Sequence, residues 1–232
     1  IVDICRERNI RIVEDATESL GTYYLNPELR DRHTGTVGDI GCFSFNGNKI
    51  ITTGGGGMLV TSNAEYAKKA RYLTTQAKDD EVRYVHNEVG FNFRLTNVQA
   101  AIGVAQMECL PEFVESKRKI YAMYKEKAGL IEGLVAAESP NYARNNHWMV
   151  PLQIEIDRYG KGREELMAFL SQHGIQTRPV WHLNHLQAPY RTCQSYRVEK
   201  AVALLKTTLC VPCSVNLSED DIDRVISNLR HG

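Results

Sequence analysis

The chain has 232 residues, of which 43% are hydrophobic, and its mean hydropathy is -0.35. This size and composition are typical of one large or two small globular domains. Lys and Arg together number 28, as do Asp and Glu, so the formal net charge of zero argues against a general binder of nucleic acids or anionic membranes. No apolar run is long enough to span a bilayer.

Residues 1–9 resemble the last turns of an amphipathic helix, and the short apolar run that follows ends in Glu14 and Asp15. A helix, an Asn turn and a strand indicate a βαβ unit, in which ligands gather at the carboxyl ends of strands. Asp15 is therefore a candidate ligand-binding acid, with a helix N-cap as the alternative. Because the chain begins inside a helix, without an initiator Met or a signal peptide, we expect it to be the C-terminal part of a longer polypeptide.

Two apolar runs, Ile40–Phe45 and Met58–Val60, are predicted to be strands. Between them lie Lys49 and four consecutive glycines, Gly54–Gly57, which are typical of a tight reversal that needs free φ. We therefore expect Lys49 on a short, firmly held loop at the end of a strand. A lysine in a partly apolar pocket loses hydration, and its amine becomes a usable nucleophile or base. The alternative is an ordinary solvated lysine.

The remaining elements follow in chain order. Helices are predicted over 65–73, with Asn63 as cap, over 98–107, with Thr96 or Asn97 as cap, and from Pro111 to about 127. Later strands are predicted over 147–156, 175–181 and 209–215, and helices over 162–173, 196–205 and 218–229. The last helix has a capping-box-like start at Ser218-Glu-Asp-Asp221. The pattern changes after Gly129, so we expect a first domain over residues 1–127 and a small C-terminal α/β domain over 128–232.

The six cysteines are scattered, mostly in apolar segments, as expected of buried free thiols in a reducing, cytoplasmic compartment. Cys210 and Cys213 have C-x-x-C spacing, but they fall in a strand-like run, which disfavours a redox or metal site. His182 and His185 stand three residues apart, and no third metal ligand is evident beside them.

Asp15, Ser44 and Lys49 together form the set of groups that pyridoxal phosphate requires. A lysine forms a Schiff base with the cofactor, a carboxylate pairs with its pyridine nitrogen, and a hydroxyl binds its phosphate. The carboxylate keeps the ring nitrogen protonated, because a nearby opposite charge favours the charged form.

Six motifs occur along nearly the whole chain. They are Glu14-Asp15-Ala16, Ser44-Phe45-x-x-x-Lys49, Gly56-Gly57-x-x-Val60, Gly90-Phe-Asn-Phe-Arg94, Gln99-Ala-Ala-Ile-Gly103 and Leu217-Ser-Glu-Asp-Asp-Ile-Asp-Arg-Val-Ile226. In this order and spacing the chain resembles the DegT/DnrJ/StrS group of sugar-nucleotide aminotransferases. Residues 17–19 and 46–54 are most similar to the branch that acts on 4-keto-hexosamine nucleotides.

The resemblance implies a fold-type I pyridoxal-phosphate-dependent transferase, of which this chain holds the C-terminal part of the large α/β domain and a small C-terminal α/β domain. Lys49 would be the Schiff-base lysine and would shuttle the proton, Asp15 would pair with the pyridinium nitrogen, and Ser44 would bind phosphate. Glu18 stands where many family members carry Gln or His against the phenolic oxygen of the cofactor. A glutamate there would have to be protonated or turned away, because two anions repel.

The resemblance also implies a homodimer with shared active sites. Asn92 would reach the phosphate of the neighbouring subunit's cofactor. Tyr84, His86 and Arg94 would lie near the shared site, with an ordinary polar interface loop as the alternative. His182 and His185 would line the sugar-nucleotide pocket, with ordinary packing as the competing interpretation. The family's N-terminal portion is absent from this chain, so we expect the chain alone to bind the cofactor weakly or not at all.

The implied reaction transfers an amino group, from a glutamate-type donor, to the 4-keto group of a nucleotide-linked deoxy sugar for cell-surface glycan or sugar biosynthesis. The alternatives are a non-catalytic regulatory relative that binds pyridoxal phosphate, and a 3-dehydratase-type relative, although that branch replaces the lysine with histidine. A nucleotide-binding module with Gly54–Gly57 as a phosphate cradle is disfavoured, because Lys49 precedes the glycines, whereas the lysine of a P-loop follows them.

Overall fold

The computed structural model describes all 232 residues, which form two compact units. The first unit comprises Ile1–Val114 and Ser139–Trp148, and the second comprises Glu115–Glu138 and Met149–Gly232. Both units combine helices with sheets, which confirms the predicted α/β class. The compact units differ from the domains expected over residues 1–127 and 128–232, because Ser139–Trp148 belongs to the first unit. The position of the domain boundary stays a prediction.

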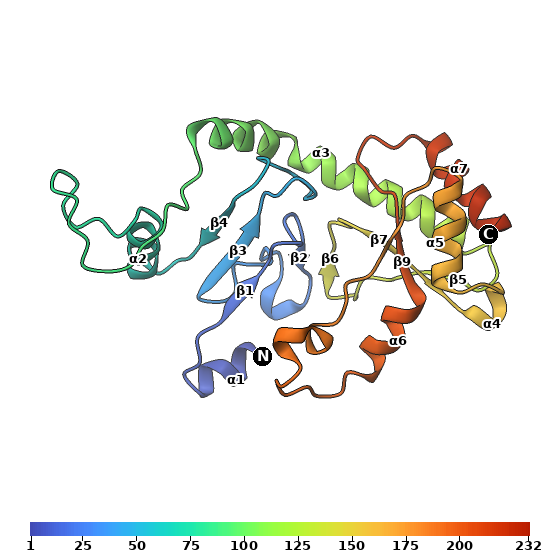
Figure 1. The fold of residues 1–232 in the computed structure, drawn as a ribbon, viewed down its shortest axis with the longest axis horizontal. Coiled ribbons are helices and arrows are strands. Elements are labelled where there is room, and N and C mark those ends of the chain that lie inside the picture. The colour runs from blue at the N-terminus through green and yellow to red at the C-terminus, as the bar shows by residue number, and fades with distance from the viewer. The chain divides into compact units, whose positions relative to one another are not determined.

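The first unit contains a three-stranded sheet in the order β1-β3-β4 (Figure 1). Its elements are α1 (Val2–Glu7), β1 (Val13–Asp15), β2 (Tyr23–Tyr24), a 3-10 turn (Pro27–Leu29), β3 (Ile40–Ser44), β4 (Gly57–Val60), α2 (Ala64–Thr74), the first part of α3 (Asn97–Ala128) and β6 (Ala143–Arg144). β1 runs parallel to β3, β4 runs antiparallel to β3, and β2 pairs with β6. The two parallel strands therefore end at the same edge of the sheet, where Asp15 and Ser44 lie.

α2 begins as predicted, because the Asn63 side chain accepts hydrogen bonds from the Glu65 and Tyr66 backbone amides. α3 differs from the prediction: it is one continuous helix of 32 residues with Pro111 inside it, not two helices. A proline inside a helix costs about 3 kcal/mol. Val114, Ile120 and Tyr124 follow it as buried side chains, and their burial holds the helix together beyond the proline.

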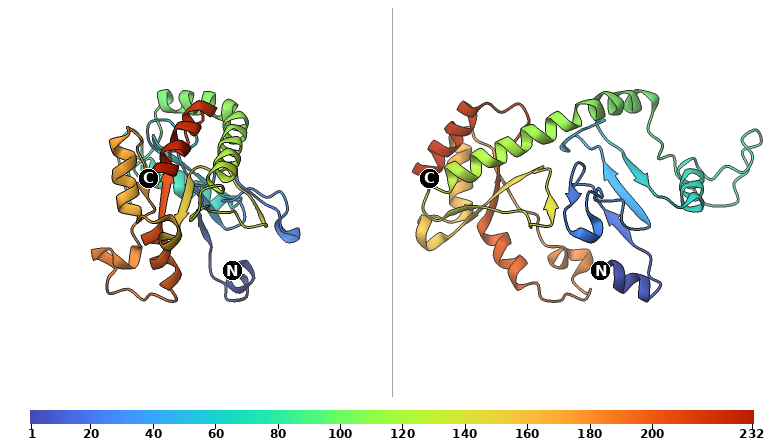
Figure 2. Two further views of the ribbon diagram at one scale, coloured as in Figure 1. Left: turned by 90° about the vertical axis from the view of Figure 1, so that its right-hand side faces the viewer. Right: turned by 180° about the vertical axis from the view of Figure 1, so that it is seen from behind.

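The second unit contains a four-stranded antiparallel sheet in the order β5-β7-β9-β8. Its elements are the end of α3, β5 (Leu134–Ala136), β7 (Val150–Ile154), α4 (Ile156–Tyr159), α5 (Arg163–Gln172), β8 (Arg178–Pro179), two 3-10 turns (Asn184–Leu186 and Ala188–Tyr190), α6 (Glu199–Thr207), β9 (Thr208–Val211) and α7 (Glu219–His231). α5 and α7 contact each other, as the two views of Figure 2 also show. The Ser218 side chain caps α7 through the Asp221 backbone amide, as the sequence predicted.

For this unit, one predicted strand is much shorter than expected and one strand was missed. The strand expected over 175–181 is only Arg178–Pro179, an edge strand, because a proline has no N–H to give to a ladder. β5 was not predicted at all, because a strand of three residues is too short to show a period.

No helix combines the length and the apolar character needed to cross a bilayer. All six cysteines are free thiols, but only Cys210 and Cys213 are buried, and Cys193 is exposed. The expectation of buried thiols therefore holds for two of them.

Candidate active site

The segment between β3 and β4 is a closed loop that carries Lys49. Phe45 and Ile51 are buried at its base. The Thr53 amide donates to the Phe45 carbonyl, and the Phe45 amide donates to the Gly56 carbonyl, both at 3.0 Å. The loop is therefore fixed at both ends, as the sequence predicted for a firmly held loop at the end of a strand.

The glycine run is explained by the backbone and by packing. Gly54 and Gly56 have φ values of 78° and 79°, a region that favours glycine. A Cβ on Gly56 would stand 2.4 Å from Leu95 Cδ2, and one on Gly57 would stand 2.2 Å from the Phe43 carbonyl oxygen. Local backbone conformation and packing therefore explain glycine at these three positions.

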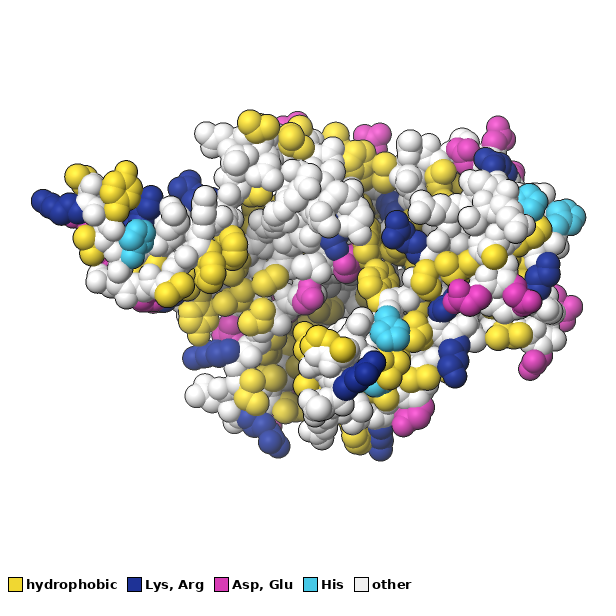
Figure 3. Space-filling view, in the orientation of Figure 1, with side chains coloured by type: hydrophobic (Ala, Val, Ile, Leu, Met, Phe, Trp, Pro, Cys, Tyr) yellow, Lys and Arg dark blue, Asp and Glu magenta, His cyan; other side chains and the backbone are white.

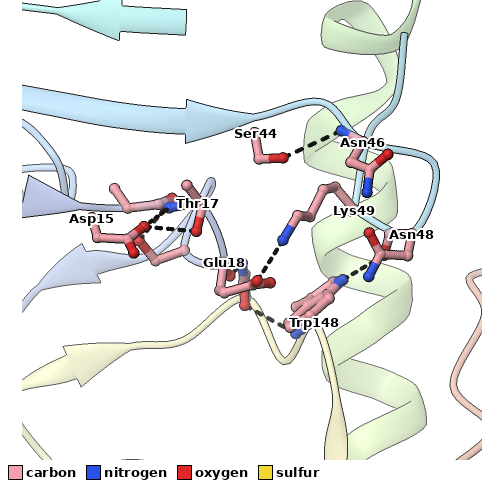
Figure 4. A network of polar contacts seen from close by, with 11 residues as sticks. Asp15, Thr17, Glu18, Ser44, Asn46, Asn48, Lys49 and Trp148 are labelled. Atoms are coloured by element: carbon pink, nitrogen blue, oxygen red, sulfur yellow. Dashed lines mark hydrogen bonds and ion pairs between the residues drawn. The ribbon is translucent and has the colours of Figure 1, made fainter. Parts of the chain in front are cut away.

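The Lys49 amine is enclosed by two groups (Figure 4). Its Nζ donates to the Glu18 carboxylate, and it lies 4.7 Å from the centre of the Trp148 ring. The Lys49 side chain is 11% exposed, so the alternative of a solvated surface lysine is wrong. The amine is thus shielded from solvent and held by a carboxylate and an aromatic ring.

Asp15 ends β1 and is held by a tight turn. Its Oδ1 accepts hydrogen bonds from the Thr17 hydroxyl at 2.7 Å and from the Thr17 amide at 3.2 Å. These two bonds, and then the positive charge of Lys49, lower the pKa of Asp15 below its usual value, so the carboxylate stays ionised at neutral pH. No helix follows Asp15, so the alternative role as a helix N-cap is not realised.

Ser44 is the last residue of β3, and its hydroxyl accepts a hydrogen bond from the Asn46 amide at 3.3 Å. Figure 4 shows Asp15, Glu18, Ser44 and Lys49 in one region of the first unit. Four of the predicted site residues are thus brought together, although Asp15 and Lys49 lie 34 positions apart in the chain. Their roles toward a cofactor stay predictions.

This donor set fits pyridoxal phosphate. The amine of Lys49, the ionised carboxylate of Asp15 and the hydroxyl of Ser44 are the three kinds of group that hold its aldehyde carbon, its ring nitrogen and its phosphate. Glu18, in contrast, is paired with the amine, and in this structure it provides an acceptor for Lys49.

The loop between α2 and α3 holds four other predicted site residues, which are all exposed: Tyr84, His86, Asn92 and Arg94. His86 Nδ1 lies 2.7 Å from the Gln76 carbonyl oxygen. Asn92 forms an isolated backbone bridge with Thr75. Apolar side chains also reach the surface of this loop (Figure 3). The structure brings none of the four into hydrogen bonding with Lys49, and their binding roles stay predictions.

His182 and His185 belong to the second unit. His182 is exposed, and His185 lines a cavity of about 550 Å³ together with Tyr190, Cys193 and Tyr196. No three His, Cys, Asp or Glu side chains are grouped to hold a metal ion. Contact with a sugar nucleotide stays a prediction for both histidines.

Two residues were missed by the sequence analysis: Trp148, which lies over the Lys49 amine, and Asn146, which accepts a hydrogen bond from the Trp148 amide. Both lie about a hundred residues after Lys49, at the start of the strand predicted over 147–156. No local period or motif marks them, because their role depends on a long-range return of the chain.

The chain was compared with known proteins. It is 38% identical over 237 residues to EpsN of Bacillus subtilis, covering 100% of this chain and 58% of EpsN. It is 37% identical over 236 residues to GDP-perosamine synthase of Caulobacter vibrioides, covering 99% of this chain and 60% of the synthase. The chain thus spans less than two thirds of the length of these relatives.

A solved structure also matches nearly the whole chain. The crystal structure of DesI in the presence of its TDP-sugar product matches 99% of this chain and 57% of DesI, with a TM-score of 0.87 and 27% identity. A family model, described as the DegT/DnrJ/EryC1/StrS aminotransferase family, matches residues 1–230. This match confirms the resemblance found from the sequence motifs: the chain belongs to the DegT/DnrJ/EryC1/StrS aminotransferase family.

Proposed function

We propose that the natural polypeptide containing this chain is a pyridoxal-phosphate-dependent aminotransferase that acts on a nucleotide-linked sugar. The observation that carries this proposal is the Lys49 amine, held between Glu18 and Trp148 in the same region as the ionised carboxylate of Asp15. Family membership supports the reaction class. Bound pyridoxal phosphate would supply an electron sink that stabilises negative charge at the carbon from which a proton leaves.

The residues of this chain have separate tasks in that reaction. Lys49 would hold the aldehyde carbon of the cofactor through its amine, and it would act as the base that moves a proton at the substrate carbon. Asp15 stays ionised and would keep the ring nitrogen of the cofactor protonated. Ser44 would donate a hydrogen bond from its hydroxyl to the phosphate. Glu18 accepts a hydrogen bond from the Lys49 amine and thereby orients it.

The proposed substrate is the 4-keto form of a nucleotide-linked deoxy sugar, and the proposed donor is glutamate. The relatives support the substrate class: one is named GDP-perosamine synthase, and DesI was crystallised with a TDP-sugar product. In the second unit, His185 and the exposed His182 are proposed to contact the sugar nucleotide. We place the reaction in the cytoplasm, where a chain with six free thiols stays reduced.

We further propose a homodimer with shared active sites. The loop between α2 and α3 and the start of α3 expose large apolar side chains, which monomeric surfaces rarely gather: Val89, Phe91, Phe93, Val98 and Val104. Asn92 lies within this surface and is proposed to bind the phosphate in the partner's site, with Tyr84, His86 and Arg94 beside it. A mixture of Lys49→Ala and Asn92→Ala subunits would regain part of the activity that each variant lacks, if sites are shared.

The test uses the natural polypeptide loaded with pyridoxal phosphate. Borohydride reduction and peptide mapping would place a pyridoxyl group on Lys49, and glutamate would change the absorbance of the bound cofactor. A panel of nucleotide 4-keto sugars would then identify the acceptor by product analysis. An adduct on Lys49 without turnover on any sugar would favour the regulatory alternative, and a labelled protein that dehydrates the sugar would favour the dehydratase alternative.

A further inference from the structure

The segment Ser139–Trp148 returns from the second unit to the first and is held there by Asn146. Asn146 is 2% exposed, and its Nδ2 donates to the Glu18 carbonyl at 3.0 Å and to the Leu20 carbonyl at 2.9 Å. Its backbone amide donates to the Thr22 hydroxyl at 3.1 Å. One buried side chain thus binds the returning segment to the loop that carries Glu18, the partner of Lys49.

The same side chain also fixes the backbone that leads to Trp148. Asn146 Oδ1 accepts a hydrogen bond from the Trp148 amide at 2.9 Å, so both donors and the oxygen of its amide group are used. His147, between them, has a φ of 48°, in the left-handed region that a residue with a Cβ rarely adopts. The turn is therefore held by specific bonds and directs the indole of Trp148 toward the Lys49 loop.

Two parts of Trp148 act on Lys49 (Figure 4). The indole Nε1 donates to the carbonyl of Asn48, the residue before Lys49, at 2.7 Å. The face of the ring lies 4.7 Å from Lys49 Nζ, within the range in which an aromatic ring attracts a cation. The N–H thus fixes the peptide that carries Lys49, and the ring fixes the end of its side chain.

We infer that Trp148 is a positioning residue for the Lys49 amine and that Asn146 sets the position of Trp148. The proposed function requires Lys49, Asp15 and Ser44, and it assigns no role to the returning segment. The inference rests on that function only in giving the Lys49 amine a chemical task. The contacts of the Trp148 indole with the Lys49 amine and with the Asn48 carbonyl do not depend on the cofactor.

The experiment compares Trp148→Phe with Trp148→Leu in the natural polypeptide. Both variants remove the indole N–H and keep an apolar group over the amine, and they differ in the aromatic face. Glu18 and Asp15, the charged groups near Lys49, are unchanged in both. Trp181→Leu is the matched control, because Trp181 is 61% exposed and lies in the second unit.

The first measurement is the rate of acetylation of Lys49 by acetic anhydride at one fixed pH in the protein without cofactor, followed by peptide mass mapping. The aromatic face holds the amine, so acetylation is expected to be about threefold faster in the Leu variant than in the Phe variant. The second measurement is hydrogen exchange of the Lys49 loop. Exchange is expected to be about threefold to tenfold faster in both variants, because both lose the bond to the Asn48 carbonyl.

Equal acetylation rates for the two variants, with unchanged loop exchange, would overturn the inference, and the melting temperature shows that each variant is folded. If Trp148→Leu does not fold, the deciding test is hydrogen exchange of the Lys49 loop in Trp148→Phe, compared with the unchanged protein. A pyridoxyl adduct measured on the same samples separates the two proposals. If Lys49 never forms this adduct while the acetylation rates differ as expected, the proposed function fails and the positioning role holds.

Discussion

The two units of the chain place their apolar side chains differently. In the second unit, a single hydrophobic core joins the end of α3, the sheet and the helices α5 and α7, and Leu166, Leu170 and Leu229 are fully buried in it. In the first unit, apolar residues of the sheet remain exposed, among them Val13 at 62% and Met58 at 51%. The hydrophobic core therefore lies in the second unit, whereas buried polar side chains such as Thr22, Thr53 and Asn146 occur in the first.

In the first unit, individual polar side chains form hydrogen bonds to backbone groups that are distant in the sequence. Glu14 accepts hydrogen bonds from the amides of Gly35, Val37 and Gly38, and Asn146 binds the loop of Glu18. Each such bond contributes about 1 kcal/mol, less than a buried leucine. We therefore expect substitutions in the first unit to change activity most and substitutions in the core of the second unit to change the free energy of unfolding most. The following experiments test this difference.

The largest expected effect is on function, in the first unit. Lys49→Ala removes the amine that is proposed to bind the cofactor, so turnover is expected to fall to background and no pyridoxyl adduct is expected on the Lys49 peptide. Turnover and borohydride trapping measure this. Lys119→Ala, which removes an amine from a side chain that is 71% exposed, is the control and is expected to leave both unchanged. Turnover retained by Lys49→Ala would contradict the proposed role.

The largest expected effect on stability is in the second unit. Leu170→Ala leaves a cavity in the closed core and is expected to lower the free energy of unfolding by about 2–5 kcal/mol, measured by urea denaturation. Leu130→Ala makes the same chemical change at a side chain that is 76% exposed and is expected to shift it by at most about 0.5 kcal/mol. Similar losses of unfolding free energy for Leu170→Ala and Leu130→Ala would contradict the burial of Leu170 in a packed core.

A smaller effect is expected at Glu14 in the first unit. Glu14→Gln keeps the shape but has one acceptor oxygen for three amides, so the free energy of unfolding is expected to fall by about 1–3 kcal/mol. Hydrogen exchange at Val37 and Gly38 is expected to accelerate. The exposed Glu28, changed to Gln, serves as control. Unchanged exchange at both amides would show that the carboxylate does not hold this loop.

The smallest effect is a pH dependence in the second unit. Burial, and then the nearby Cys213, raises the pKa of the Cys210 thiol to about 11. The folded state favours the protonated thiol, so this stabilisation is complete below about pH 9 and is lost as pH rises from about 9 to 11. Cys210→Ala is expected to flatten the decline of the melting temperature over this window. Cys193→Ala, at an exposed thiol, is expected to leave the decline unchanged.

Much of the fold could be predicted from the chain alone. Local patterns gave the strands on both sides of Lys49, the cap at Asn63 and the capped start of α7. The errors occur where tertiary packing overrides a local signal. Pro111 is a helix breaker by its chemistry, but buried side chains that follow it keep α3 continuous. β5 and β8 exist because β7 and β9 lie beside them, which no short run of residues reveals.

For the site, the motifs predicted Lys49, Asp15 and Ser44 as candidate groups, because an acid and a hydroxyl end neighbouring strands and an amine follows closely in the next loop. The surroundings of the amine could be found only in the folded chain. Trp148 lies over the amine and Asn146 holds Trp148 through a return of the chain about a hundred residues later, and hydrogen bonds between segments so far apart leave no period or motif in the sequence.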